Sequence, residues 1–232
     1  MDLIELTIDG TKVQSKPGTR LLKAALDAGI YIPNLCYIHE AELPFGGCRL
    51  CYVDVEGRGL VTACTQPVRD GLVINTQTPE VIKVRQTAFK LLLAYHHLDC
   101  RICWKNKNCE LQKIAGKVKV KLKRPEEFRG LPTEWEPLDT TNPFITYDPN
   151  RCILCGKCVW VCGEKNKQSF IDFAFRGYRT RLNLSAVPST PGNKCASCGE
   201  CIAICPTAAL QSPQVQMQLD DKTQSGVESG AS

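Results

Sequence analysis

The stretch Cys152-Ile-Leu-Cys155-Gly-Lys-Cys158-Val-Trp-Val-Cys162 spaces four cysteines as C-x2-C-x2-C-x3-C. The same spacing returns in a second run, which precedes Pro206 and contains Cys195, Cys198, Cys201 and Cys205. Each run curls three thiolates onto one rigid iron–sulfur cluster, and its fourth cysteine binds the cluster of the other run. The runs therefore predict two [4Fe–4S] clusters, one bound by Cys152, Cys155, Cys158 and Cys205, the other by Cys195, Cys198, Cys201 and Cys162.

A third group of cysteines, nearer the amino end, predicts a [2Fe–2S] cluster. Its members are Cys36, Cys48, Cys51 and Cys64. Cys48 and Cys51 form the close C-x2-C pair of plant-type [2Fe–2S] loops, although the outer spacings differ from that pattern. Gly46 and Gly47 precede the pair, where a backbone without side chains can approach the inorganic sulfides. Four thiolates also suit tetrahedral zinc, which is the alternative at this site.

The remaining three cysteines, Cys100, Cys103 and Cys109, need a fourth ligand. By spacing alone, either His96 or His97 can supply it. Three thiolates and one imidazole are an ordinary set for structural zinc. Because the other three groups indicate iron–sulfur sites, we expect a [4Fe–4S] cluster here, with zinc as the alternative.

A disulfide framework does not explain these cysteines. Their number, 15, is odd, and their spacings repeat as ligand motifs. The amino end lacks the pattern of a signal peptide, and no apolar run approaches the roughly 18 to 20 residues of a membrane span. We therefore expect a cytoplasmic protein with no membrane span, in a compartment that keeps thiols reduced.

The charge of the chain does not indicate a nucleic-acid partner. The formal net charge is +5, but four oxidised clusters with their thiolates would add about −7. The densest basic stretch, Lys117-Val-Lys-Val-Lys-Leu-Lys123, alternates lysines with aliphatic residues and has no interleaved aromatics. The alternation predicts an edge strand with one face packed and the other exposed to solvent. A docking surface for an acidic partner is the alternative.

Hydrophobic periodicity predicts an α+β fold. A hairpin over residues 3–15, a helix over 20–28 capped by Thr19, and strands near 51–55, 60–62 and 72–74 suggest a β-grasp domain. A second helix is predicted from the Thr78 cap to His96. We expect five segments: a β-grasp [2Fe–2S] domain (1–78), a small helical domain with the histidine-ligated [4Fe–4S] cluster (79–124), a Pro-rich connector (125–142), a twin [4Fe–4S] ferredoxin-like domain (143–211) and a mobile tail (212–232).

The order of these sites resembles the amino-terminal relay of iron-only hydrogenases. It is similar also to the same region of NAD-linked formate dehydrogenase large subunits, to the small diaphorase subunit of NAD-reducing hydrogenases, and to the start of the largest hydrophilic subunit of respiratory complex I. The twin runs look closer to the hydrogenase and formate dehydrogenase relays than to the complex I subunit. The resemblance implies that the H-x3-C-x2-C-x5-C motif binds its cluster through His96, with Cys100, Cys103 and Cys109.

The sequence contains no catalytic apparatus of its own, because it lacks a dinucleotide fingerprint and a phosphate loop, and every cysteine is assigned as a ligand. The resemblance implies a non-catalytic electron-transfer subunit of an NAD(P)-linked oxidoreductase. Its expected partners are a flavin-containing NAD(P)H-binding subunit and a hydrogenase or formate dehydrogenase catalytic subunit, with ferredoxin as a further candidate partner and electron bifurcation as an open question. A free-standing multi-cluster carrier of the ferredoxin type is the alternative.

Overall fold

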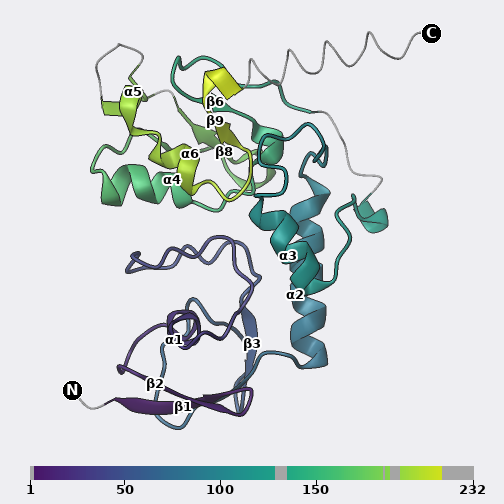
Figure 1. The fold of residues 1–232 in the computed structure, drawn as a ribbon, viewed down its shortest axis with the longest axis vertical. Helices are drawn as coiled ribbons and strands as arrows, with labels where there is room; N and C mark the ends of the chain where they lie inside the picture. Colours follow the sequence, from purple (N-terminus) through teal and green to yellow (C-terminus); the bar gives the residue numbers. More distant parts are fainter. Residues whose placement is uncertain (1–2, 129–134, 185, 189–193, 216–232) are drawn as a thin grey trace. The chain divides into compact units, whose positions relative to one another are not determined.

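A computed structural model describes residues 3–128, 135–184, 186–188 and 194–215. The chain has a mixed fold of helices and strands (Figure 1) and divides into two compact units. The first contains residues 1–94 and 113–123, and the second contains residues 95–112 and 124–232. Most of the tail expected at 212–232 lies outside the described residues.

The first unit is built on a five-stranded sheet with the strand order β2-β1-β5-β3-β4. β1 (Ile4–Ile8) and β2 (Thr11–Ser15) form the predicted hairpin, and Asp9 and Gly10 both take the positive φ that its two-residue turn requires. β5 (Val73–Asn75) pairs in parallel with β1, whereas β3 (Tyr52–Val55) pairs antiparallel with β5 and with β4 (Gly59–Thr62).

Two helices of this unit differ slightly from the prediction. α1 spans Leu21–Asp27, but Arg20 occupies its N-cap position without a side-chain hydrogen bond, so the Thr19 cap is wrong. α2 spans Pro79–Ala94, and the Thr78 hydroxyl accepts a hydrogen bond from Val81 N at 3.2 Å, as a capping residue should. The helix ends at Ala94 rather than at His96.

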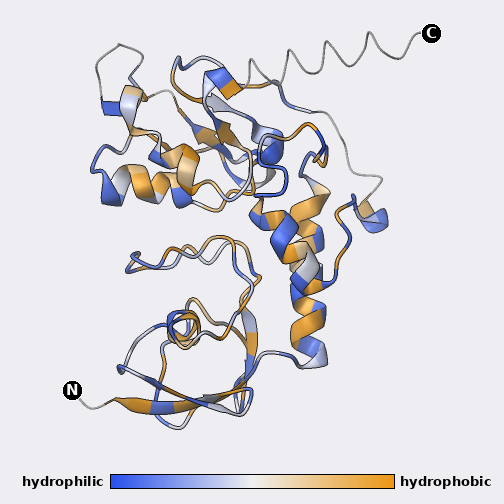
Figure 2. Ribbon diagram, viewed as in Figure 1, coloured by the Kyte–Doolittle hydropathy of each residue, from blue (hydrophilic) through white to orange (hydrophobic). Residues whose placement is uncertain are grey.

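The hydrophobic core of the first unit lies between the sheet and α1. Hydrophobic residues recur along β1 and along α2 (Figure 2). The core residues are Leu6, Ile8, Val13, Leu21, Leu22, Ile32, Val53, Val55 and Ile74. Two cysteines of the predicted [2Fe–2S] group, Cys51 and Cys64, belong to the same buried cluster. The packing that holds the sheet together therefore also fixes these thiols.

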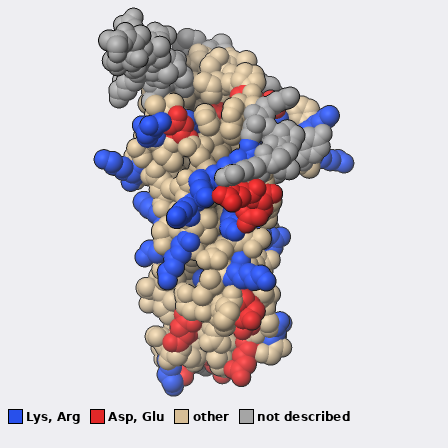
Figure 3. Space-filling model, turned by 90° about the vertical axis from the view of Figure 1, so that its right-hand side faces the viewer, with Lys and Arg blue, Asp and Glu red and all other residues tan. Residues whose placement is uncertain are grey.

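The predicted strand at 117–123 is wrong. Helix α3 spans Glu110–Val118, and the backbone turns at Lys119, where φ is 56°. The five lysines at positions 113, 117, 119, 121 and 123 are all exposed. Figure 3 shows Lys and Arg side chains gathered over this part of the surface. The alternation therefore reflects a solvated basic surface on a helix end and the turn after it.

Within its described residues, the second unit has two short two-stranded sheets. β6 (Thr146–Tyr147) pairs with β9 (Leu210–Gln211), and β7 (Asp172–Ala174) pairs with β8 (Arg181–Asn183). Single turns at Glu126–Phe128 (η1), Pro149–Arg151 (η2) and Gly177–Arg179 (η4) connect them to the loops. The helices α4 (Lys157–Trp160), η3 (Val161–Lys165), α5 (Lys194–Cys198) and α6 (Glu200–Ile204) carry cysteines of the two runs, except that Cys152, Cys155 and Cys205 lie just outside them.

No helix among the described residues is both long enough and apolar enough to cross a membrane.

Candidate iron–sulfur centres

The four thiols of the first centre lie in the first unit as two close pairs. Cys36, Cys48, Cys51 and Cys64 are between 1% and 5% exposed. The Cys36 thiol donates a hydrogen bond to Cys48 Sγ at 3.4 Å, and Cys51 and Cys64 lie close enough for each to shift the pKa of the other. Because each iron of a [2Fe–2S] rhomb takes two thiolates, two pairs of thiols suit this cluster.

The loop that carries Cys48 and Cys51 turns sharply on both sides of Cys48. Gly46 and Arg49 both take a positive φ, at 67° and 56°. Leu35 N donates to Cys48 Sγ at 3.4 Å. The hydrogen bond from Cys36 lowers the pKa of Cys48 to about 6 despite burial. Part of the ligand set is therefore ready to bind metal as thiolate near neutral pH.

The second centre lies in the second unit, in the segment between α2 and α3. Cys109 is 8% exposed, and burial, followed by the charges of Cys103 and Cys100, raises its pKa. The backbone N–H of Cys103 donates to Cys100 O at 3.3 Å, which closes the turn between these two ligands. The three thiols therefore act on one another electrostatically.

The structure distinguishes the two histidines beside this centre. The His96 ring lies beside the backbone of Arg151, and its Nδ1 atom is buried without a hydrogen-bond partner. Burial lowers the pKa of His96 to about 4, so the ring is neutral at pH 7, as a metal ligand must be. His97 instead packs its ring on Trp135 with centroids 4.7 Å apart. The surroundings of His96 therefore suit a ligand.

The third centre gathers cysteines from both C-x2-C-x2-C-x3-C runs. Cys152, Cys155 and Cys158 line one small cavity together with Cys205. Burial raises the pKa of Cys152 to about 11 and that of Cys155 to about 12, and the charge of Cys205 contributes to both shifts. These thiols are therefore neutral at pH 7 until a metal displaces their protons.

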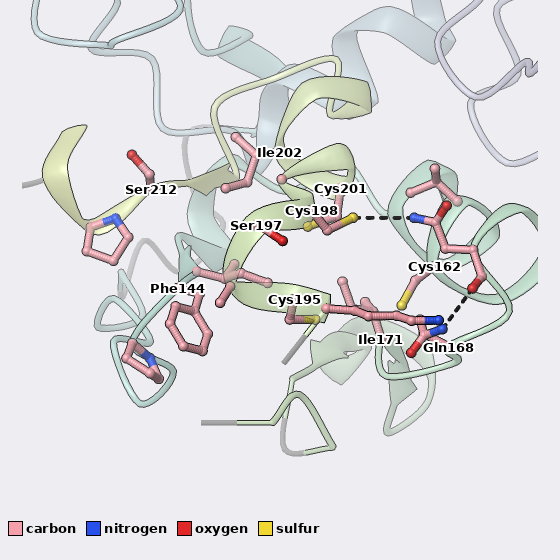
Figure 4. Close-up of a pocket in the computed structure, with 18 of the residues that line it drawn as sticks. Phe144, Cys162, Gln168, Ile171, Cys195, Ser197, Cys198, Cys201, Ile202 and Ser212 are labelled. Carbon is pink, nitrogen blue, oxygen red and sulfur yellow. Dashed lines mark hydrogen bonds between the residues drawn. The ribbon is translucent and has the colours of Figure 1, made fainter. Parts of the chain in front are cut away.

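The fourth centre surrounds a larger cavity of about 470 Å³, and Figure 4 shows its four cysteines. They are Cys162, Cys195, Cys198 and Cys201. Asn166 Nδ2 donates to Cys198 Sγ and Phe170 N donates to Cys162 Sγ, at 3.4 and 3.3 Å. Cys198 is the exposed member of the set.

Glycines shape both runs at equivalent positions, a feature that the sequence analysis missed. Gly156 and Gly199 each lie one residue after the second cysteine of their run. They take φ of 75° and 61° immediately before α4 and α6. A residue with a side chain is strained at such angles, so glycine lets each loop turn sharply into its helix. A glycine between two ligand cysteines was the available signal.

Hydrogen-bond donors to the sulfur atoms were also missed. The Tyr147 side chain, 3% exposed, lies close enough to the Cys152 thiol to lower its pKa. Leu154 N donates to Cys152 Sγ at 3.4 Å. Such donors stabilise the charge on a ligating sulfur. Among the described residues, no three His, Cys, Asp or Glu side chains meet closely enough to hold a single metal ion.

Three family models match successive parts of the chain. A 2Fe-2S iron-sulfur cluster binding domain matches residues 2–79, the NADH-ubiquinone oxidoreductase-G iron-sulfur binding region matches residues 85–124, and a 4Fe-4S binding domain matches residues 144–166. These matches define the class: an iron–sulfur protein with both 2Fe-2S and 4Fe-4S binding domains.

Known proteins are similar to this sequence over most of its length. The chain is 38% identical to the alpha subunit of the NADPH-Fe(3+) oxidoreductase of Geobacter sulfurreducens, over 78% of this chain and 21% of that protein. It is 32% identical to iron hydrogenase 1 of Clostridium pasteurianum, over 75% of this chain and 30% of that protein. This chain therefore spans less than a third of the length of both relatives.

One solved structure matches nearly end to end. A chain in the crystal structure of an NAD+-reducing [NiFe]-hydrogenase in the H2-reduced state superposes with a TM-score of 0.75 and 30% identity, covering 90% of this chain and 87% of that chain. The chain thus belongs to the family of iron–sulfur proteins that includes this hydrogenase chain, the iron hydrogenases and the 78 kDa subunit of mitochondrial NADH-ubiquinone oxidoreductase.

Proposed function

We propose that this chain is an electron-transfer relay subunit of an NAD(P)-linked oxidoreductase. The observation that carries the proposal is that the cysteines of the two C-x2-C-x2-C-x3-C runs line two common cavities, in a chain that covers 87% of a chain of an NAD+-reducing hydrogenase. The described residues offer thiols and backbone donors around these centres. Each cluster, when bound, accepts and releases one electron.

The proposed ligand sets follow the four centres. One [2Fe–2S] cluster takes Cys36, Cys48, Cys51 and Cys64, and three [4Fe–4S] clusters take the sets His96, Cys100, Cys103 and Cys109; Cys152, Cys155, Cys158 and Cys205; and Cys195, Cys198, Cys201 and Cys162. The proposed domains are a β-grasp domain at 1–78, a histidine-ligated domain at 79–124, a connector at 125–142 and a twin-cluster domain at 143–211.

The residues around each centre would shield the clusters from water and set their reduction potentials. At the first centre, burial of all four thiols to 5% exposure or less excludes solvent, which disfavours additional negative charge. Backbone donors such as Leu35 N partly offset this effect. The fourth centre has the exposed Cys198. A short path from the cluster to the protein surface favours electron transfer to another protein. We therefore assign to this centre the step in which electrons leave the chain.

The proposed partners are a flavin-containing NAD(P)H-binding subunit and a separate catalytic subunit, a hydrogenase or a formate dehydrogenase. The flavin is needed because NAD(P)H delivers two electrons whereas each cluster carries one. The basic surface at residues 113–123 is suited to an acidic partner, ferredoxin included.

Purification from the native organism tests the proposal. A hetero-oligomer should be recovered in which NAD(P)H bleaches the visible absorption of the clusters, and assays with H2 and with formate would identify the catalytic subunit. The isolated chain should be inert to NAD(P)H. Rapid reduction of the isolated, flavin-free chain by NADH would contradict the relay role, and recovery of the native protein as a monomer would favour the alternative of a free-standing carrier.

A further inference from the structure

Arg85 is a buried arginine on the face of α2 that packs on the sheet. The residue as a whole is only 4% exposed. Nε and Nη2 both donate to the carbonyl oxygen of Tyr52, at 2.9 and 2.5 Å, and Nη1 donates to the carbonyl oxygen of Thr76 at 2.9 Å. The guanidinium group is therefore fixed in position by neutral acceptors.

The positive charge of Arg85 lacks a carboxylate partner among the residues that the structure describes. Within the part of the chain that the structure describes, no Asp or Glu forms an ion pair with it. A buried charge without a counter-charge is costly, and native proteins normally pair it. The sequence keeps a full positive charge here, so a negative group that the polypeptide does not provide is expected nearby.

The groups that surround Arg85 indicate where the expected negative group would lie. Burial lowers the pKa of Arg85, and among the charges that oppose this effect the largest contribution comes from Cys51, followed by Asp9 and Tyr31. The Asp9 carboxylate is already engaged, because it accepts hydrogen bonds from Thr76 N at 2.7 Å and from the Thr76 hydroxyl at 2.5 Å. Tyr52, which accepts two of the Arg85 hydrogen bonds, follows Cys51 directly in the sequence. Arg85 is therefore anchored beside a ligand of the first centre.

We propose that Arg85 is a positioning residue that raises the reduction potential of the [2Fe–2S] cluster by placing a buried positive charge next to Cys51. The inference rests on the proposed function, in that it takes a [2Fe–2S] cluster to be bound at the first centre. Reduction adds one electron to a cluster that is already anionic, and a fixed positive charge in a medium of low dielectric constant favours this step. The electron comes from the flavin-containing subunit proposed above, and Arg85 itself gains and loses neither electron nor proton.

A purely structural role makes a different prediction. If Arg85 served only to tie α2 to the carbonyls of Tyr52 and Thr76, then Arg85→Lys, which cannot reproduce the planar fork, would disturb the protein about as much as Arg85→Gln. A role for the charge separates the two variants, because lysine keeps the positive charge and glutamine removes it. Lys83→Gln is the matched control, because Lys83 lies on the same helix with an exposed side chain.

The test is a potentiometric titration of the cluster-loaded full chain, in which the EPR signal of the reduced [2Fe–2S] cluster is followed. We expect the midpoint potential of Arg85→Gln to be more negative than that of the wild type, Arg85→Lys to stay close to the wild type, and Lys83→Gln to be unchanged. Because Arg85 is buried, the shift should persist at high salt.

An unchanged or more positive potential in Arg85→Gln would overturn the inference. If Arg85→Gln does not retain the cluster, the comparison rests on Arg85→Lys: a wild-type potential supports the role of the charge, and a clear negative shift overturns it. A wild-type chain without any [2Fe–2S] signal refutes the proposed function itself, whereas a normal signal with an unmoved potential refutes only the role of Arg85.

Discussion

Replacement of His96 by cysteine should keep the cluster of the second centre and lower its reduction potential. The buried Nδ1 atom of His96 has no hydrogen-bond partner, which favours this side chain over its neighbour as the proposed ligand. Cysteine is an alternative ligand for the same iron, and it binds as a thiolate. The substitution therefore adds one negative charge to the cluster without removing a ligand.

The size of the shift follows from the charge and its surroundings. Because the ring nitrogen is buried, an effective dielectric constant near 20 is more suitable than that of water, and two unit charges about 5 Å apart then interact by about 3 kcal/mol. For a one-electron couple, in which 59 mV corresponds to a tenfold change, this amounts to a decrease of about 140 mV. Rieske centres, whose two histidines raise the potential by roughly 250 mV or more, support this magnitude per ligand.

A potentiometric titration with low-temperature EPR detection measures this shift, and the other clusters of the same molecule serve as internal references. His97→Ala is the matched control: since the His97 ring packs on Trp135, its loss should leave the cluster and its potential in place. Loss of the cluster in His97→Ala but not in His96→Ala would refute the assignment, and so would an unchanged or higher potential in His96→Cys.

The loaded chain should contain about 14 iron atoms, two at the first centre and four at each of the others, in anaerobic iron and sulfide analysis; stoichiometric zinc would instead assign the first or second centre to zinc. Tyr147→Phe removes a hydroxyl that acts on Cys152 and should lower the potential of that cluster by about 20–60 mV, the range expected for loss of one hydrogen bond, as measured by redox titration. Asn166→Ala removes the donor to Cys198 and should shift the fourth centre in the same direction but less, because water replaces the lost hydrogen bond at the exposed Cys198. An equal or larger shift for Asn166→Ala than for Tyr147→Phe would contradict the role assigned to burial.

Sequence patterns were sufficient to predict the first hairpin and the grouping of the thiols. The hairpin at 3–15 followed from alternation and an Asp-Gly turn, and the structure contains it as β1 and β2. The grouping of thiols followed from spacing, and the structure gathers Cys205 with Cys152, Cys155 and Cys158 around one cavity. The hairpin depends on residues a few positions apart, whereas Cys205, which lies 53 residues after Cys152, was assigned from the repeated motif.

The strand predicted at 117–123 was wrong because the prediction used only the period-two spacing of the lysines and not the spacing of the apolar residues before them. The lysine alternation has period two, but the residues buried on α3 are Leu111, Ile114, Ala115 and Val118, which follow the helical i, i+3, i+4, i+7 spacing. Burial of these apolar residues on one face stabilises the helix. The lysines are solvated, so pairing them in a strand would add no comparable stability.

The roles of Arg85 and Tyr147 could not be predicted from local pattern. The Arg85 hydrogen bonds reach a carbonyl 33 residues away, and the Tyr147 hydroxyl accepts a hydrogen bond from the backbone of Leu182, 35 residues away. An arginine on a helix is by default a solvated residue. Only the tertiary fold shows that Arg85 is buried and that it lies beside Cys51.

The backbone links the second and third centres of the proposed relay directly. The His96 ring lies beside the backbone of Arg151, the residue before Cys152, and the Cys109 sulfur lies 3.9 Å from the carbonyl oxygen of Pro206, the residue after Cys205. Two ligands of one centre thus each contact the peptide next to a ligand of the other. The Thr207 hydroxyl donates to the Arg151 carbonyl at 2.8 Å and joins the two contacts. Because these links lead to the Cys152 and Cys205 set, an electron at the second centre would pass to the third centre before it reached the fourth.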